Sequence, residues 1–125
     1  MSADVCDYVR REANWSQETV SAMYLNNKNE VVGTVVVAKG GRDSAELDPA
    51  PVFQGALLTN ARRFIMVHNH PSGDPHPSPH DVALTKRLIK IGETLGIPLL
   101  DHVVVGEREC VSLRDLGVIG VQERG

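Results

Sequence analysis

The chain has few cysteines, no basic excess and no long apolar run, and each absence removes a class of protein. Its two cysteines, Cys6 and Cys110, form neither a Cys-x-x-Cys pair nor a zinc-finger spacing, so we expect reduced thiols. The formal net charge of −3 provides no overall basic surface for nucleic acid. No apolar run approaches the roughly 18 residues of a membrane span, and the N-terminus is polar. These features predict a cytoplasmic protein without a membrane partner.

The length of 125 residues suits one domain with a modest core, and 42% hydrophobic residues are ordinary for a globular protein. We expect a single domain over residues 1–125, with residues 1–15 as a loosely attached N-terminal helix. Strand and helix patterns alternate after a hairpin, which predicts an α/β fold with a mixed sheet flanked by helices. The expected elements are a helix at 3–14, strands at 18–25 and 30–38, a helix from 49 to about 60, an apolar strand at 64–67, a helix at 79–95 and strands at 97–105 and 109–111.

Three local patterns refine this outline. The near-continuous valine run between residues 31 and 37 predicts a strand covered on both faces. Asp48-Pro49 is typical of a helix N-cap followed by its first residue. Val52, Ala56 and Leu57 would form the buried side of that helix, with Phe53 as a further candidate. The basic clusters Arg62-Arg63 and Lys86-Arg87-Lys90 are interpreted as ordinary solvated faces rather than as a nucleic-acid patch.

The stretch from His68 to Asp81 is the most informative part of the chain and holds four of its five histidines. His68 and His70 lie two apart, so on an extended chain their imidazoles face the same side. Asp81 can supply a third ligand, and an open fourth position is the catalytic arrangement of zinc. Neutral imidazole and carboxylate ligands suit zinc without excluding iron, cobalt or manganese.

Ser78 and Asp81 also have an explanation that needs no metal. Ser78-Pro79-His80-Asp81 is a helix start, with Ser78 at the N-cap, proline at the first helical position and Asp81 three residues after the cap. The two interpretations are compatible, because a helix start fixes the direction of Asp81 and its positive end favours the ionised carboxylate.

The spacing His68-x-His70, seven residues, Ser78, two residues, Asp81 resembles the metal signature of the JAMM (MPN-plus) metallopeptidase-like proteins. The sequences HNHPSGDP and LGIPLLDHVVVG are more closely similar to bacterial RadC-type JAB-domain proteins, and this resemblance runs from about Glu18 to Gly117. It implies the JAB/MPN fold, which is related to the cytidine deaminase fold. A deaminase itself would need His-x-Glu and Pro-Cys-x-x-Cys, which this chain lacks. The letters HNH are also not the HNH nuclease motif, whose residues are spread along a ββα unit.

The resemblance further implies a zinc-dependent hydrolase, a metallopeptidase or isopeptidase acting on a peptide or protein substrate. Zinc would be held by His68, His70 and Asp81 and would activate a water. Glu18 corresponds to the family's general acid/base, and Ser78 would stabilise the oxyanion. Two other acids compete with Glu18 for this role, but neither suits it as well: Glu12 lies on the expected N-terminal helix, and Glu30 lies in the second half of the hairpin.

A second class of function stays open: a non-hydrolytic accessory module in DNA repair or mobile-element biology, with a mainly structural metal. The intact ligand set together with Glu18 favours the hydrolase. Asp101-His102 matches the family's Asp-His; we favour a hydrogen-bonded structural pair, and the alternative is a role in orienting a ligand. The family's usual basic residue near the start of the helix at 49 is replaced by Asp48-Pro49, so substrate recognition could differ.

Overall fold

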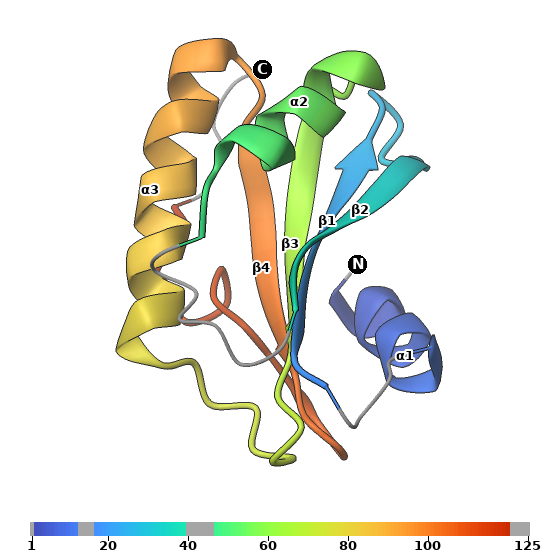
Figure 1. The fold of residues 1–125 in the computed structure, drawn as a ribbon, viewed down its shortest axis with the longest axis vertical. Coiled ribbons are helices and arrows are strands. Elements are labelled where there is room, and N and C mark those ends of the chain that lie inside the picture. Colours follow the sequence, from blue (N-terminus) through green and yellow to red (C-terminus); the bar gives the residue numbers. More distant parts are fainter. Residues whose placement is uncertain (1, 13–16, 40–46, 121–125) are drawn as a thin grey trace.

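The computed structural model of the protein describes residues 2–12, 17–39 and 47–120. It shows a mixed sheet with helices on both faces (Figure 1). Within these residues the elements are α1 (Ser2–Glu12), β1 (Thr19–Leu25), β2 (Val31–Lys39), α2 (Ala50–Leu58), β3 (Arg63–Asn69), α3 (Pro79–Leu95), β4 (Leu99–Val105) and β5 (Cys110–Ser112). The predicted α/β class with a mixed sheet is confirmed. The predicted helix end at 13–14 and the terminal residues 121–125 lie outside the described part.

The strand order is β2-β1-β3-β4-β5. β1 is antiparallel to both β2 and β3, whereas β3 and β4 are parallel and are connected through α3. A parallel pair needs such a crossover, because a short hairpin can join only antiparallel strands. As a result, the start of β1, the end of β3 and the start of α3 meet at one end of the sheet.

Two apolar cores cover the two faces of the sheet. The larger core packs α2 and α3 against one face and includes Tyr24, Phe64, Leu84 and Leu88, all at most 1% exposed. The smaller core packs Val5 of α1 against the other face. The helices therefore lie on opposite sides of the sheet, with α1 apart from α2 and α3 in Figure 1. Among the described residues, none of the helices combines the length and apolar character required to cross a membrane.

Two burial predictions are wrong. β2 lies at the edge of the sheet, so its valine run is not covered on both faces: Val31 is 53% exposed, Val32 43% and Val36 49%. Leu57 of α2 is 60% exposed, whereas the other three candidates for the buried side of that helix, Val52, Phe53 and Ala56, are buried. An apolar run is common to central strands and edge strands, so strand order decides which residues are covered.

The helix starts are close to their predicted positions. α2 begins at Ala50 with Pro49 at the N-cap, one residue later than expected, although Asp48 Oδ1 still accepts a hydrogen bond from the Ala50 N–H at 2.9 Å. α3 has Ser78 at its N-cap and ends at Gly96, which has a left-handed φ of 74°. Glycine adopts this conformation without the steric penalty of a Cβ, so it terminates α3 as predicted.

The expectation of reduced thiols is wrong. Cys6 of α1 and Cys110 of β5 form a disulfide, with a Cα–Cα distance of 6.1 Å. Packing α1 on its face of the sheet brings these residues together although they are 104 apart in sequence. Cysteine spacing gives no sign of a contact that depends on how a helix lies across a sheet.

Candidate metal centre

Strand β3 carries two histidines to the end of the sheet where the three elements meet. His68 is the second-last residue of β3, and its side chain is 2% exposed, while His70 directly follows the strand. The centroids of the two imidazole rings are 4.7 Å apart. The structure thus places the two rings side by side, as their spacing predicts.

The tautomer of His70 follows from its backbone contacts. Its main-chain N–H donates to Val105 O at 2.9 Å, and its ring Nδ1 lies 2.8 Å from Asp74 O. A carbonyl oxygen only accepts, so Nδ1 carries the hydrogen and Nε2 of the neutral ring keeps a free lone pair. Nε2 lies 3.4 Å from Asp81 Oδ2, and the Asp81 carboxylate raises the pKa of His70 above its ordinary value.

The start of α3 positions Asp81. Ser78 Oγ accepts from the Asp81 N–H at 3.1 Å, and Asp81 Oδ2 accepts from the Ser78 N–H at 2.8 Å, so the predicted capping box is confirmed. Asp81 Oδ1 lies 2.9 Å from His68 Nδ1. Helix capping therefore directs the carboxylate toward the histidines.

Asp81 is a buried and ionised carboxylate, with a side chain that is 0% exposed. Burial alone would raise the pKa of Asp81, but the contacts with His68 and His70, together with the Ser78 N–H, hold it far below its usual range. The carboxylate thus keeps its negative charge in a position where water does not reach it.

His68, His70 and Asp81 offer ligand atoms that all lie within 4.8 Å of one another, the one such group within residues 2–12, 17–39 and 47–120. Within the described part of the chain, His68 Nδ1 is buried and has no assigned hydrogen bond, although it lies 2.9 Å from Asp81 Oδ1. A buried nitrogen without a hydrogen bond beside an ionised carboxylate is what a divalent cation would satisfy. Two imidazoles and one carboxylate suit zinc and other first-row metals, so these residues fit a metal ion.

Glu18 reaches this group from β1. The antiparallel register pairs Thr19 with Asn69 and so places the residue before β1 at the end of β3. Glu18 Oε2 lies 2.5 Å from His68 Nε2, and the Glu18 side chain is 28% exposed. Glu30 is bonded to Asn26 at the opposite end of β1, and the side chain of Glu12 lies outside the described residues. Of the two acids whose side chains are described, Glu18 alone borders the ligand group.

Asp101 and His102 are hydrogen-bonded to each other, as expected, through the main-chain N–H of His102 and Oδ1 of Asp101 at 2.7 Å. Asp101 is structural, because its carboxylate accepts hydrogen bonds from the main-chain N–H of His102, the hydroxyl of Ser112 and the main-chain N–H of Arg114. These bonds hold β5 and the turn after it. They leave the His102 ring to make other contacts.

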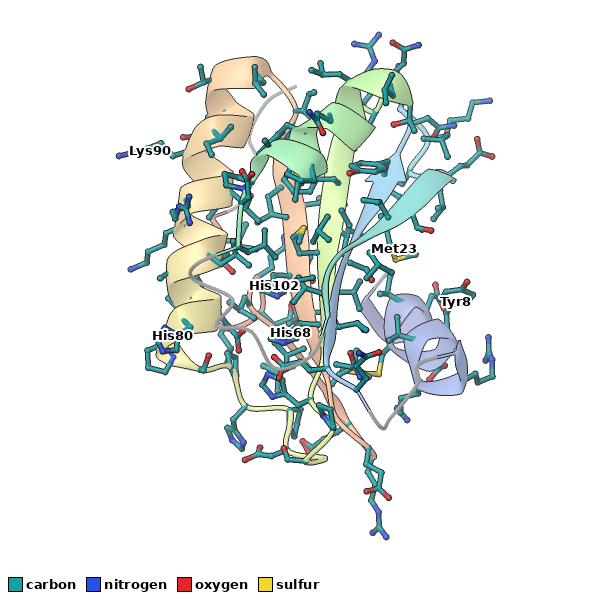
Figure 2. The ribbon with its side chains drawn as sticks, in the orientation of Figure 1. Tyr8, Met23, His68, His80, Lys90 and His102 are labelled. Carbon is teal, nitrogen blue, oxygen red and sulfur yellow. A yellow bond between two sulfur atoms is a disulfide. The ribbon has the colours of Figure 1, made fainter. Side chains whose placement is uncertain are left out.

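His102 lies next to His68, and the two rings are stacked with centroids 6.3 Å apart (Figure 2). Its Nδ1 is 2.7 Å from Thr85 Oγ1, and the Thr85 hydroxyl donates its hydrogen to Asp81 O at 2.8 Å. Its Nε2 is buried and has no hydrogen-bond partner among the residues that the structure describes. Complete burial, together with His68, lowers the pKa of His102 to about 4, so the ring is neutral at pH 7. Thr85 was not predicted, since nothing in its local sequence points to the site.

The loop after β3 packs closely on the turn between β4 and β5. Glu107 N–H donates to Gly73 O at 3.2 Å, and a Cβ added at Gly106 would lie 2.5 Å from that same oxygen. A glycine at this position therefore lets the loop approach. The loop residue His76 is exposed and paired with Asp74 at 2.6 Å, so it stands outside the ligand group.

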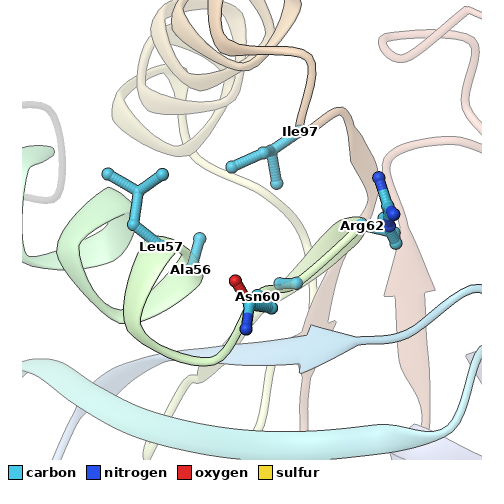
Figure 3. A pocket seen from close by; sticks show the side chains of 6 residues that line it. Ala56, Leu57, Asn60, Arg62 and Ile97 are labelled. Carbon is cyan, nitrogen blue, oxygen red and sulfur yellow. The ribbon is translucent and has the colours of Figure 1, made fainter.

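A separate pocket of about 250 Å³ lies at the other end of the sheet, between the last turns of α2 and α3 (Figure 3). Its lining residues are Ala56, Leu57, Asn60, Ala61, Arg62 and Ile97. None of these belongs to the ligand group. Most residues of the predicted basic clusters are exposed, as expected of a solvated face: Arg62, Lys86, Arg87 and Lys90. Arg63 is half-buried and donates to Asn29 Oδ1 at 2.9 Å.

The amino-acid sequence is similar to one known family and to several bacterial proteins. A family model of the RadC-like JAB domain matches residues 1–118. A UPF0758 protein of Desulforamulus reducens is 41% identical over 117 residues, which cover 93% of this chain and 52% of that protein. A UPF0758 protein of Bacillus licheniformis is 46% identical over 104 residues, with 83% and 46% covered. UPF0758 protein YsxA of Bacillus subtilis is 44% identical over 104 residues, with 83% and 45% covered.

The chain thus spans about half the length of these relatives. The matched family, together with the ligand group, supports a metal-binding or hydrolase-like module with the JAB/MPN fold. Because the family model covers nearly the whole chain, the protein belongs to the RadC-like JAB-domain family.

Proposed function

We propose that this domain is a zinc-dependent hydrolase of peptide or isopeptide bonds. The observation that carries the proposal is the position of the Glu18 carboxylate, 2.5 Å from one nitrogen of a histidine whose other nitrogen faces the buried Asp81. A structural zinc site is usually closed by four protein ligands, whereas the group found in the described residues has three. Here three ligands are bordered by a carboxylate that can take up a proton.

A zinc ion held by His68, His70 and Asp81 would supply Lewis-acid activation of a water molecule and of the scissile carbonyl. Exposure sets the side from which a substrate arrives: the Glu18 side chain is 28% exposed and that of His70 17%, whereas His68 and Asp81 are buried beneath them. The scissile amide would therefore approach over Glu18 and His70.

Glu18 would move the proton. Its carboxylate accepts a proton from the attacking water as the new C–O bond forms, and the same proton then passes to the amide nitrogen as the C–N bond breaks. The products are a carboxylic acid and a free amine, and Glu18 returns to its ionised form. Its partial exposure lets it reach both the water and the leaving group.

Ser78 is placed to stabilise the oxyanion. Its oxygen accepts the Asp81 N–H, and no acceptor for its own hydroxyl hydrogen occurs among the described hydrogen bonds. That hydrogen is available to a carbonyl oxygen that becomes negative during attack. One residue would thus both cap α3 and serve the reaction.

The test measures metal content first and hydrolysis second. We expect about one zinc per chain in the wild type and in His76→Ala, and loss of zinc in His70→Ala, because His76 is a loop histidine outside the ligand group. Both variants remove an imidazole from the same loop, so they form a matched pair. Equal zinc contents in the two variants would contradict the ligand assignment.

Hydrolysis is then assayed on a pool of peptides from digested bacterial protein, with new amino termini counted by mass spectrometry. We expect cleavage by the zinc-loaded wild type and none by Glu18→Gln, which keeps the ligands and loses the proton acceptor. Zinc binding without cleavage of peptides or of isopeptide-linked conjugates would favour the accessory module with a structural metal.

A further inference from the structure

Asn69, the residue between the two histidines, is tied to both neighbours of Glu18. Its side chain is 1% exposed. Asn69 Oδ1 accepts from the Thr19 N–H at 2.7 Å and from the Thr19 hydroxyl at 2.6 Å, and its Nδ2 donates to Gln17 O at 3.0 Å. One carboxamide therefore holds the chain on each side of the proposed acid/base.

The orientation of this carboxamide is fixed by its partners. A main-chain N–H can only donate, and a main-chain carbonyl can only accept. The oxygen of Asn69 must therefore face Thr19, and its nitrogen must face Gln17. A flipped amide would bring two donors together at Thr19 and two acceptors together at Gln17.

We propose that Asn69 is a positioning residue that holds Glu18 against the metal ligands, an inference that rests on the proposed hydrolase function. β1 begins at Thr19, so Glu18 lies just beyond the strand. Its carboxylate contacts His68 from there, and the only side chain bonded to both flanking residues in the described hydrogen bonds is Asn69.

The position of Asn69 explains why it can act on Glu18 without touching the ligands. Alternate residues of a strand point to opposite sides, so Asn69 faces away from His68 and His70. The backbone of β3 thus connects the ligands and the positioning side chain rigidly. Loss of the carboxamide should release Glu18 while leaving the three ligands in place, and a misplacement of about 1 Å is worth about a hundredfold in rate.

Asn26 supplies a matched control at the opposite end of β1. Its carboxamide also forms hydrogen bonds through both polar atoms. Oδ1 accepts from the main-chain N–H groups of Lys28 and Glu30, and Nδ2 donates to the Glu30 carboxylate. Asn69→Ala and Asn26→Ala thus each remove three hydrogen bonds from an end of β1. Only Asn69→Ala removes them beside Glu18.

The test reads the Glu18–His68 contact directly, by NMR of histidine ring nitrogens in the metal-free protein. Glu18→Gln defines the His68 signal without the carboxylate. We expect Asn69→Ala to shift the His68 signal as far as Glu18→Gln does, and Asn26→Ala to leave it at the wild-type position. If Asn69→Ala does not fold, Asn69→Ser replaces it, because a serine hydroxyl cannot span Gln17 and Thr19.

A wild-type His68 signal in the Asn69 variant would overturn the inference, and so would equal shifts in the Asn69 and Asn26 variants. A second arm loads the proteins with cobalt(II) and records visible absorption. We expect Asn69→Ala to bind as much cobalt as the wild type and to give the Glu18→Gln spectrum. Absence of cobalt binding by the wild type would sink the proposed hydrolase, while the metal-free arm would still decide the role of Asn69.

Discussion

Breaking the disulfide between Cys6 and Cys110 should lower the free energy of unfolding by several kcal/mol. The bridge closes a loop between residues 104 apart, which spans most of the chain. In the chain-entropy description, a loop of about 100 residues restricts the unfolded ensemble by about 4.7 kcal/mol at 25 °C. Removal of native disulfides from small domains typically costs about 2–5 kcal/mol. We therefore expect a loss in this range, near its upper end.

The loss should have a structural counterpart in α1. Of the α1 side chains that the structure describes, Val5 and Cys6 are buried, at 9% and 6% exposure, and Val9 is partly buried against the same core. Burial of one valine contributes about 1.5–3 kcal/mol, so without the bridge α1 is held weakly. Amide hydrogen exchange should accelerate in α1 more than in β3.

Urea unfolding of the wild type with and without a reductant measures the effect, and mass spectrometry after alkylation confirms the state of the thiols. Cys110→Ser is the control, because its unfolding free energy should not respond to the reductant. A difference below about 1 kcal/mol between oxidised and reduced wild type would refute the reasoning, since it would mean that the bridge does not constrain the unfolded chain.

Three further predictions concern the site and its surroundings. Gly106→Ala should displace the loop at Gly73 O, destabilise the fold by about 1–3 kcal/mol in urea unfolding and weaken zinc binding in a zinc titration. Gly120→Ala is the control: an added Cβ there meets nothing within 4 Å, so neither the unfolding free energy nor the zinc affinity should change. Ser78→Ala should lower the unfolding free energy by about 1 kcal/mol through loss of the cap, and an unchanged value in thermal unfolding would contradict the capping role. His102 has a folded-state pKa of about 4, below its unfolded value, so the unfolded chain binds a proton more readily than the folded one. In metal-free protein the free energy of unfolding should therefore be highest above about pH 6.5 and fall by up to about 3 kcal/mol as the pH drops to 4. Subtracting the same profile of His102→Gln isolates this term, and parallel profiles would contradict it.

Local signals account for the parts of the site that could be predicted. Ser78 and Asp81 indicate the start of α3, and Gly96 indicates its end. The two histidines follow an apolar strand at a spacing of two, so a single stretch of chain carries the whole ligand group. Such patterns reflect backbone preferences over a few residues, which act in the same way in any fold.

The features that could not be predicted depend on contacts between distant segments. Asn69 bonds to residues 50 and 52 positions away, and its local sequence shows only that it lies between two histidines. The Cys6–Cys110 bridge follows from the way α1 lies across the sheet, and the exposure of Val36 follows from the position of β2 at the sheet edge. The position of Glu18 also depends on a distant contact, because the pairing of β1 with β3 brings it to the histidines. Only the family resemblance indicated its role.

The short distance in sequence between the three ligands has a consequence for the order in which the site assembles. His68 and Asp81 are about a dozen residues apart, whereas Glu18 is separated from His68 by 50. Closing the longer loop costs about 1.2 kcal/mol more chain entropy, so the ligand group can form as soon as β3 and α3 dock. Glu18 arrives only when β1 has taken its place between β2 and β3. We therefore expect a folding chain to acquire its metal ligands before it acquires the carboxylate that would make the metal reactive.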